Sequence, residues 1–190
     1  MIKALAAVAA ACLAVTAWAA NPTVELETSS GRITLELYPE KAPTSVENFL
    51  SYVRSGHYDG TIFHRVIDRF MIQGGGFDQE MKQKEVGAPI RNEAKNGLKN
   101  KAGAIAMART SNPHSATAQF FINLVDNANL DYPSPDGWGY TVFGAVTEGM
   151  DVVRQIGQVR TTTVGYYRDV PAEPIVIESA RVVGDATTSN

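Results

Sequence analysis

Hydrophobic and polar residues alternate along the first segments that follow the N-terminal region. Residues 23–28 and 32–37 each place an apolar side chain at every second position. Alternation with a period of two is typical of a strand with one buried face. Ser29, Ser30 and Gly31 lie between the two segments and favour a turn. The pattern predicts a β-hairpin with both strands half-buried.

The pattern changes to helical spacing after Pro43, a residue type that is common in the first turn of a helix. The apolar positions then recur at i, i+3, i+4 and i+7 on one stripe: Val46, Phe49, Leu50 and Val53. Thr44 and Glu47 have the spacing of a capping box, in which each side chain bonds a free amide at the helix start. Gly56 is suited to end the helix. These residues predict an amphipathic helix.

The rest of the chain reads as short strands and polar loops, with one more helix. Two strands are predicted within 63–77, and the others at 103–108, 120–124, 142–146 and 174–183. The second helix is predicted at 150–156, and the loops at 78–102 and 109–118. About eight strands and two helices fit one domain, and this count alone leaves a β-sandwich and a closed β-barrel open.

One apolar strand pair carries two long polar side chains. The run Phe63–Phe77 contains Arg65 and Gln73 among apolar neighbours, and it includes the three glycines Gly74–Gly76. Burying long polar groups without partners is costly. Arg65 and Gln73 therefore either satisfy buried groups of the fold or line a pocket that faces a ligand. The glycines allow the backbone to bend or to approach other groups closely.

Composition adds little beyond a single globular domain. The chain has 190 residues, 44% of them hydrophobic, and a formal net charge of −3, so neither nucleic acid nor an anionic membrane is an expected partner. Several lysines gather loosely, but glutamates interrupt them, and we interpret the group as a solvated surface: Lys82, Lys84, Lys95, Lys99 and Lys101.

The N-terminal region has the pattern of a secretory signal peptide. Lys3 precedes an uncharged, apolar run that ends in Ala17-Trp18-Ala19, which places small residues at the positions that a signal peptidase reads. We expect removal of residues 1–19, a domain at 20–184, a polar tail at 185–190, and a periplasmic protein without stable membrane association. An uncleaved membrane anchor is the alternative, since the run is near the lower length limit for spanning.

The single cysteine of the chain, Cys12, lies within this leader. The mature chain would then have no cysteine, which is compatible with export although no disulfide supports it. Lipid attachment at Cys12 is a further alternative, but the alanines before it, Ala9–Ala11, lack the usual leucine.

Three blocks of sequence resemble the cyclophilin family of peptidyl-prolyl cis-trans isomerases. The blocks are Phe63–Phe77, then Ala106–Arg109 with Ser115–Ile122, and finally Gly139–Gly144. Their order and spacing agree with the family over about residues 22–183. The resemblance implies a mainly β fold, a closed eight-stranded antiparallel β-barrel capped by two α-helices. It also implies an enzyme that accelerates rotation about X–Pro bonds during protein folding, similar to exported bacterial cyclophilins.

The same resemblance implies a set of site residues. Arg65 takes the catalytic position, and Gln73 holds the substrate carbonyl while orienting Arg65. The expected substrate-binding residues are Phe70, Met71, Ala108, Arg109, Gln119, Phe121, Leu130 and Tyr140. The apolar ones form a cup for the proline ring, Gln119 contacts the substrate, and the backbone of Ala108 and Arg109 pairs with an extended peptide.

Arg65 suits the chemistry of X–Pro rotation. Twisting the bond breaks amide resonance, and the barrier is about 18–20 kcal/mol. At the top of the barrier the proline nitrogen exposes a lone pair, so a donor aimed at it binds the twisted state better than either planar state. A guanidinium offers rigid, permanently charged donors for this purpose. The alternative for Arg65 is a structural bridge between carboxylates or carbonyls.

A few positions depart from the common family pattern. Arg109 stands where most cyclophilins have Asn, which preserves a backbone contact but puts a side-chain contact in doubt. Asn129 replaces a tryptophan whose indole donates a hydrogen bond to cyclosporin, and Tyr140 replaces a histidine, as in exported bacterial members. Asp68-Arg69 replaces a Pro-Gly pair, from which we expect only a local change.

The sequence offers no motif for metal, nucleotide or covalent chemistry. His57, His64 and His114 lack partners at metal-ligand spacing, Gly74–Gly76 is not followed by a phosphate-loop Gly-Lys-Ser/Thr, and no Gly-x-Ser-x-Gly elbow occurs. We therefore expect no cofactor and no metal. The resemblance implies unfolded or extended proline-containing polypeptides as partners, and we expect a monomer. A peptide-binding or chaperone module without turnover is the second hypothesis, and hydrolysis through His64 is a third.

Overall fold

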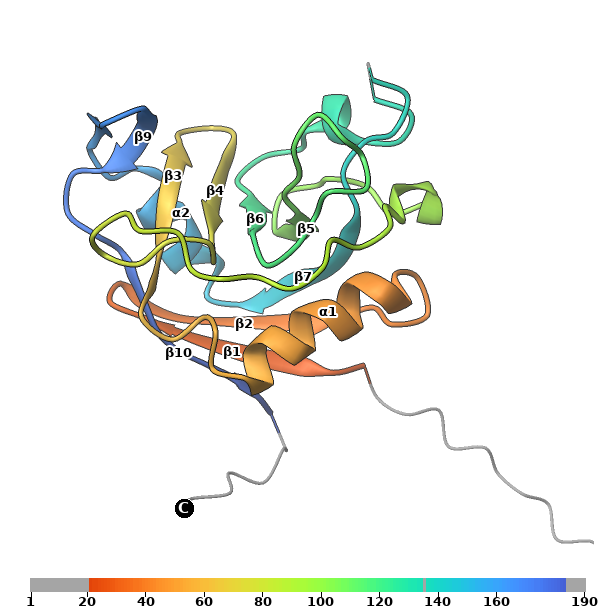
Figure 1. Cartoon of the computed structure of the whole chain (residues 1–190), viewed down its shortest axis with the longest axis horizontal. Helices are drawn as coiled ribbons and strands as arrows, with labels where there is room; N and C mark the ends of the chain where they lie inside the picture. Colours follow the sequence, from red (N-terminus) through yellow and green to blue (C-terminus); the bar gives the residue numbers. More distant parts are fainter. Residues whose placement is uncertain (1–20, 135, 184–190) are drawn as a thin grey trace, which may run out of the picture.

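The predicted strands close into a barrel in the computed structural model, which describes residues 21–134 and 136–183. The elements in chain order are β1 (Thr23–Thr28), β2 (Gly31–Leu37), α1 (Pro43–Arg54), β3 (Thr61–Ile67), β4 (Met71–Gly74), η1 (Ala94–Asn96), β5 (Ala104–Met107), β6 (Phe120–Asn123), η2 (Ala128–Leu130), β7 (Val142–Glu148), α2 (Met150–Gly157), β8 (Thr161–Val164), β9 (Tyr167–Pro171) and β10 (Val176–Val182). The barrel order is β1-β10-β3-β4-β6-β5-β7-β2, with antiparallel neighbours throughout (Figure 1). The predicted fold is confirmed.

Several predictions concern parts of the chain that lie outside the described residues. They are the signal peptide at 1–19, lipid attachment at Cys12 and the polar tail at 185–190. Within the described residues, no helix combines the length and the apolar character that a membrane crossing needs.

The predicted first hairpin is formed by β1 and β2, whose apolar side chains face the core. These fully buried residues are Val24, Leu26, Ile33, Leu35 and Leu37. Gly31 begins β2 with a φ of 128°, and a Cβ at that position would lie 2.9 Å from Cγ2 of Val152. Glycine is therefore needed where the start of β2 meets α2.

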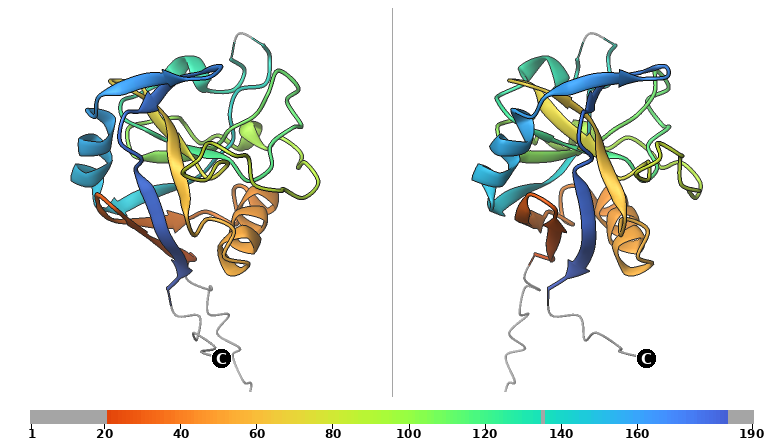
Figure 2. Two further views of the ribbon diagram at one scale, coloured as in Figure 1. Left: turned by 60° about the vertical axis from the view of Figure 1, so that its left-hand side comes forward. Right: turned by 90° about the vertical axis from the view of Figure 1, so that its left-hand side faces the viewer.

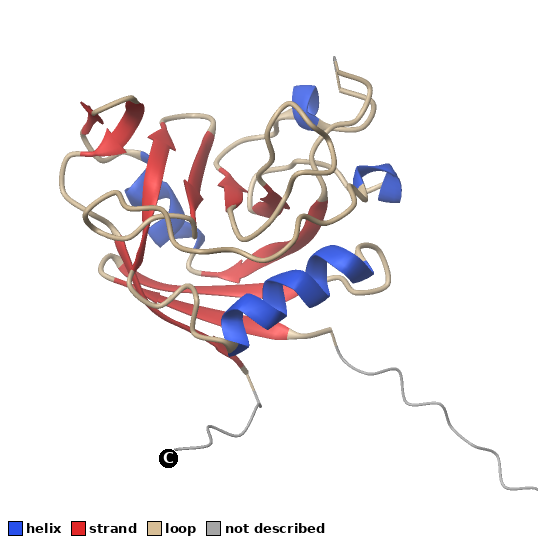
Figure 3. Cartoon of the chain, in the orientation of Figure 1, coloured by secondary structure: helices blue, strands red, loops and turns tan. Residues whose placement is uncertain are grey.

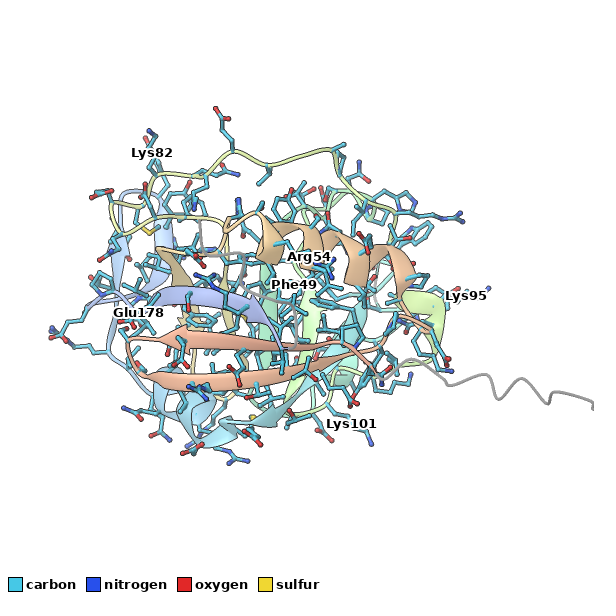
Figure 4. All side chains as sticks on the ribbon, turned by 90° about the horizontal axis from the view of Figure 1, so that it is seen from below. Phe49, Arg54, Lys82, Lys95, Lys101 and Glu178 are labelled. Atoms are coloured by element: carbon cyan, nitrogen blue, oxygen red, sulfur yellow. The ribbon has the colours of Figure 1, made fainter. Side chains whose placement is uncertain are left out.

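Helix α1 lays its predicted apolar stripe into the barrel core. The ring of Phe49 lies 5.2 Å from that of Tyr58, 5.5 Å from that of Phe120 and 5.2 Å from that of Phe143. This cluster joins the helix to β6 and β7, and it dominates the largest buried side chains of the interior. Figure 4 shows Phe49 between the helix and the strands.

The lysine group is mostly solvated, as predicted. Lys82, Lys95 and Lys101 are exposed and extend outward from the edge of the molecule (Figure 4). Lys84 differs, because it is only half-exposed and its ammonium donates to the carbonyls of His57 and Asp59. This lysine ties the loop after β4 to the loop before β3.

The predicted capping box of α1 is wrong. The N-cap position is Ala42, and no side-chain cap bond is formed there. The carboxylate of Glu93 instead accepts from the amides of Thr44 and Ser45 at 3.0 and 2.8 Å and from the Ser45 hydroxyl at 2.7 Å. Thr44 lies inside the first turn because Pro43 already occupies the first helical position. A residue distant in sequence thus supplies the anion that a helix start favours.

A second hairpin, β8–β9, was not predicted from the sequence. It forms a two-stranded sheet outside the barrel, and β9 lies against β3 (Figure 2). All of β8 is exposed, so it lacks the alternation that marks a half-buried strand. Its run of β-branched residues, Thr161–Val164, followed by Gly165 with a φ of 58°, is the signal that could have found it.

Candidate functional site

A β-bulge in β3 turns Arg65 away from the barrel core. Phe63 pairs with Gly74 across β3 and β4, and Arg65 pairs with Gln73, so His64 is the extra residue of the bulge. Strict alternation would have put Arg65 on the same face as Phe63, which is fully buried in the core. The bulge instead places Arg65 and Gln73 together on the outer face of the barrel wall.

Nine of the ten predicted site residues line one hollow on this outer face. The hollow has a cavity volume of about 100 Å³. The strands and loops that carry its lining residues can be followed in Figure 3. Its lining residues are Arg65, Phe70, Met71, Gln73, Ala108, Arg109, Phe121, Leu130 and Tyr140. Gln119 is not part of this lining but bonds to it, as described below. The structure brings the predicted set together, and the roles of its members stay predictions.

The apolar part of the hollow is a cup built on β4 and β6. Met71 and Phe121 form its floor and are 2% and 4% exposed. The ring of Phe121 meets that of Tyr140 edge-on with 5.7 Å between the centroids. Phe70 and Leu130 pack against this cluster and are only partly buried. The cup suits a small apolar ring, with polar groups at one rim.

Arg65 stands at the polar rim. Its side chain is 43% exposed, and its Nε lies 4.0 Å from Oδ2 of Asp169 on β9, which is equally exposed. A half-exposed ion pair at this distance contributes little stability. The contact is thus looser than the buried bridge that a structural arginine would make, and the guanidinium can turn its donors toward a ligand.

Gln73 is oriented by Gln119 in this structure. The Gln73 amide donates to Oε1 of Gln119 at 2.9 Å, so its predicted contact with Arg65 stays a prediction. Gly76 makes room for this arrangement, because a Cβ there would lie 2.5 Å from the Gln119 amide nitrogen. The Ala108 amide donates to the Gln119 carbonyl at 3.0 Å. A peptide that pairs with the backbone of Ala108 would therefore donate to the Ala108 carbonyl.

The side chain of Arg109 has a role that sequence reasoning missed. It is only 3% exposed, and it ion-pairs with Asp136. Its Nε donates to the Gly139 carbonyl at 3.0 Å, and its guanidinium lies over the Tyr140 ring at 4.4 Å from the centroid. A hydrogen bond from Ser134, followed by the one from Arg109, lowers the pKa of the Asp136 carboxyl. Arg109 therefore fastens the loop before β7 to one wall of the cup.

His64 is buried beside the site rather than in it. It is 5% exposed, does not line the hollow, and its ring lies 4.6 Å from that of Phe77. Burial lowers the pKa of His64 to about 4, and nearby Arg65 acts in the same direction. Its Nδ1 is buried without a hydrogen-bond partner among the described residues. A neutral imidazole outside the hollow gives the hydrolysis hypothesis no support.

Sequence reasoning also missed three buried asparagines beneath the cup: Asn100, Asn123 and Asn127. The available signal was Asn123, a polar residue that directly follows the apolar run Phe120–Ile122 in a predicted strand. Across the described residues, no group of three or more His, Cys, Asp or Glu side chains is placed to hold a metal ion.

Comparison with known proteins gives one consistent family. A family model described as cyclophilin type peptidyl-prolyl cis-trans isomerase/CLD matches residues 23–182. The chain is 64% identical over 164 residues to a peptidyl-prolyl cis-trans isomerase of Streptomyces antibioticus, covering 85% of this chain and 99% of the relative. It is 56% identical over 161 residues to peptidyl-prolyl cis-trans isomerase B of Escherichia coli K12, covering 84% and 98%.

Solved structures agree with these relatives. The fold is similar to a crystal structure of a cyclophilin type peptidyl-prolyl cis-trans isomerase from Cryptosporidium parvum, with a TM-score of 0.70 and 25% identity over 85% of this chain and 97% of that one. A second crystal structure of that protein, determined in the presence of the dipeptide Ala-Pro, is similar at a TM-score of 0.70 and 26% identity over 84% and 98%.

Proposed function

The chain belongs to the cyclophilin family of peptidyl-prolyl cis-trans isomerases, and on this premise we propose that the hollow beside Arg65 is where an X–Pro bond is twisted. The enzyme class itself follows from the family and from the close relatives, and its substrates are proline-containing polypeptides. The observation that carries the proposal is that Arg65, Gln73 and an apolar cup lie together in a single hollow.

The cup explains how the substrate is held. An apolar ring that enters it contacts Met71 on β4, Phe121 on β6 and Leu130 at the end of η2. Gln73, fixed by Gln119, directs its remaining amide donor and acceptor capacity toward the substrate backbone. The side of the X–Pro bond that carries the proline is then immobilised, while the preceding residue is free to rotate.

Arg65 supplies the difference between ground and transition states. In the planar bond the nitrogen lone pair is delocalised and accepts poorly, whereas in the twisted bond it is a localised acceptor. A guanidinium beside that nitrogen therefore binds the twisted state selectively, which is the condition for catalysis. No proton is transferred and no covalent bond forms, so the neutral His64 is not needed.

The location of the reaction is a separate proposal. The apolar leader with its Ala17-Trp18-Ala19 end supports export and removal of residues 1–19. The mature enzyme would act as a monomer on client chains in the periplasm. The absence of cysteine from residues 20–190 is compatible with an oxidising compartment.

The test of the proposed function is isomerisation of a short X–Pro peptide, followed by NMR exchange spectroscopy, with wild type, Arg65→Ala and Arg181→Ala. Arg181 is a matched control, because it is 52% exposed and pairs with Asp59 at 2.9 Å away from the hollow. We expect full turnover for wild type and Arg181→Ala and a large loss for Arg65→Ala. Equal turnover of all three folded proteins would reject the proposed role of Arg65.

A further inference from the structure

Three asparagines are buried together beneath the proline cup. Asn100, Asn123 and Asn127 are 2%, 0% and 6% exposed. Each primary amide carries two N–H donors and a carbonyl acceptor, and burying such a group without partners is costly. A cluster of three such groups in one place therefore needs a bonding pattern that uses their donors, and the structure shows one.

The amides form a chain with a single direction. Asn127 Nδ2 donates to Asn123 Oδ1 at 2.7 Å, and Asn123 Nδ2 donates to Asn100 Oδ1 at 3.3 Å. Asn100 Nδ2 donates in turn to the carboxylate of Asp131 at 3.2 Å. Turning any one amide over would set acceptor against acceptor, so the orientation of each side chain is fixed by its neighbours. Bonds in such a chain polarise one another.

The second donor of each amide goes to backbone, and two of these contacts reach the cup. Asn127 Nδ2 donates to the Phe70 carbonyl at 2.9 Å, and Asn100 Nδ2 reaches the Tyr140 carbonyl at 3.5 Å. The backbone carbonyl of Asn127, and not its side chain, accepts from the Leu130 amide at 2.9 Å. Phe70 lies in the turn between β3 and β4, whereas Leu130 and Tyr140 both lie in the connection between β6 and β7, and these two connections meet at this network.

The centre of the chain is anchored in the barrel wall. Asn123 lies two residues after Phe121 on β6 and therefore on the same face as the floor of the cup. Its Nδ2 donates to the Ala104 carbonyl at 3.0 Å, and its backbone pairs with Met71 of β4. The network thus couples the buried floor of the cup to the partly buried rim residues, without lining the hollow itself.

We propose that Asn100, Asn123 and Asn127 are positioning residues that set the width of the proline cup: their side chains hold the backbones of Phe70 and Tyr140, and the main chain of Asn127 holds Leu130. The inference rests on the proposed function of the hollow. It assigns the three asparagines an effect on substrate affinity, exerted through the rim residues and not by contact with the substrate.

The expected kinetic signature differs from that of Arg65. The proline ring occupies the cup in the planar and the twisted states alike, so loosening the rim weakens both by the same amount. Such uniform loss raises KM and leaves kcat nearly unchanged, whereas loss of Arg65 lowers kcat. For Asn127→Ala we expect KM to rise about fivefold to tenfold and kcat to change less than about twofold.

The experiment compares Asn127→Ala with Thr61→Val, using NMR exchange for kcat and peptide titration for affinity. Thr61 is fully buried and donates to the Tyr58 carbonyl at 2.6 Å at the far end of β3 from the turn that holds Phe70, so it controls for the loss of one buried side-chain bond. Thermal unfolding places both variants on a common stability scale. If Asn127→Ala does not fold, Asn127→Ser replaces it.

A double-mutant cycle separates positioning from general destabilisation. In a Phe70→Ala background the rim ring is gone, so adding Asn127→Ala should raise KM by less than about twofold. A KM increase that is equal in both backgrounds, or equal in Thr61→Val, would overturn the inference. Arg65→Ala is measured in the same assay. If Arg65→Ala keeps the wild-type kcat, the proposed function is rejected. If Arg65→Ala has a low kcat but Asn127→Ala has an unchanged KM, only the present inference is rejected.

Discussion

The burial of His64 makes a quantitative prediction about the dependence of stability on pH. Its pKa is lowered from 6.5 to about 4 by burial. As the pH falls below 6.5 the unfolded chain takes up a proton on this residue, while the native protein does so only near pH 4. The contribution of neutral His64 to the free energy of unfolding is therefore complete above pH 6.5, and it is lost as the pH falls from about 6.5 to 4. That gap corresponds to about 3 kcal/mol of unfolding free energy.

Urea unfolding of wild type and His64→Gln between pH 4 and 8 measures this contribution. Wild type should lose about 3 kcal/mol more than His64→Gln over that range. Burial also lowers the pKa of His57, but His57 is present in both proteins and cancels in the comparison. The exposed His114 provides the control variant, His114→Gln, which should follow wild type.

Activity should not follow this titration. The kcat/KM for a neutral X–Pro peptide is expected to be nearly flat from about pH 6 to 9, because arginine is not deprotonated in proteins and His64 stays neutral there. Folded His64→Gln should keep most of its activity. The reasoning would be refuted by parallel stability curves for wild type and His64→Gln. A bell-shaped activity profile that His64→Gln abolishes would point instead to general acid–base catalysis.

Other predictions address the helix cap, the inhibitor and the leader. Glu93→Ala should lower the free energy of unfolding by about 1 kcal/mol because α1 loses its cap, whereas Glu47→Ala should have almost no effect in the same urea titration; equal losses would contradict the observed cap. Asn129→Trp should strengthen inhibition by cyclosporin in a titrated isomerase assay, since an indole adds a donor and apolar area, and unchanged inhibition would remove this position as the determinant. The mass of the protein from its native host should place the N-terminus near Ala20; a lipidated start at Cys12 or a retained leader would contradict cleavage.

Local elements could be predicted well because their signals are local. The alternation in 23–37 and the apolar stripe of α1 each bury one face, and both elements form as expected. Closure of the barrel was different, because the count of strands fits a sandwich equally well. Pairings such as β1 with β10 join residues far apart in sequence, and only the family resemblance decided between the two folds.

The details of the site depended on contacts that spacing does not encode. The set of lining residues was predicted from the resemblance, but the bulge at His64 that aims Arg65 outward was not. Glu93 displaced the local capping box through tertiary contact, and the buried side chain of Arg109 could not be inferred from a position usually occupied by Asn. The asparagine network likewise joins Asn123 on β6 to Asn100 and Asn127 in two separate loops, so the spacing within one segment does not reveal the whole network.

The most direct test of the account is the rate of cis–trans exchange of an X–Pro peptide on the enzyme at saturation, compared between wild type and Arg65→Ala. Removing one aligned donor from such a site costs about 2.7–4 kcal/mol of transition-state stabilisation. The account predicts an on-enzyme rate that is about a hundred to a thousand times lower, with native stability and nearly unchanged peptide affinity. An unchanged rate in folded Arg65→Ala would contradict it.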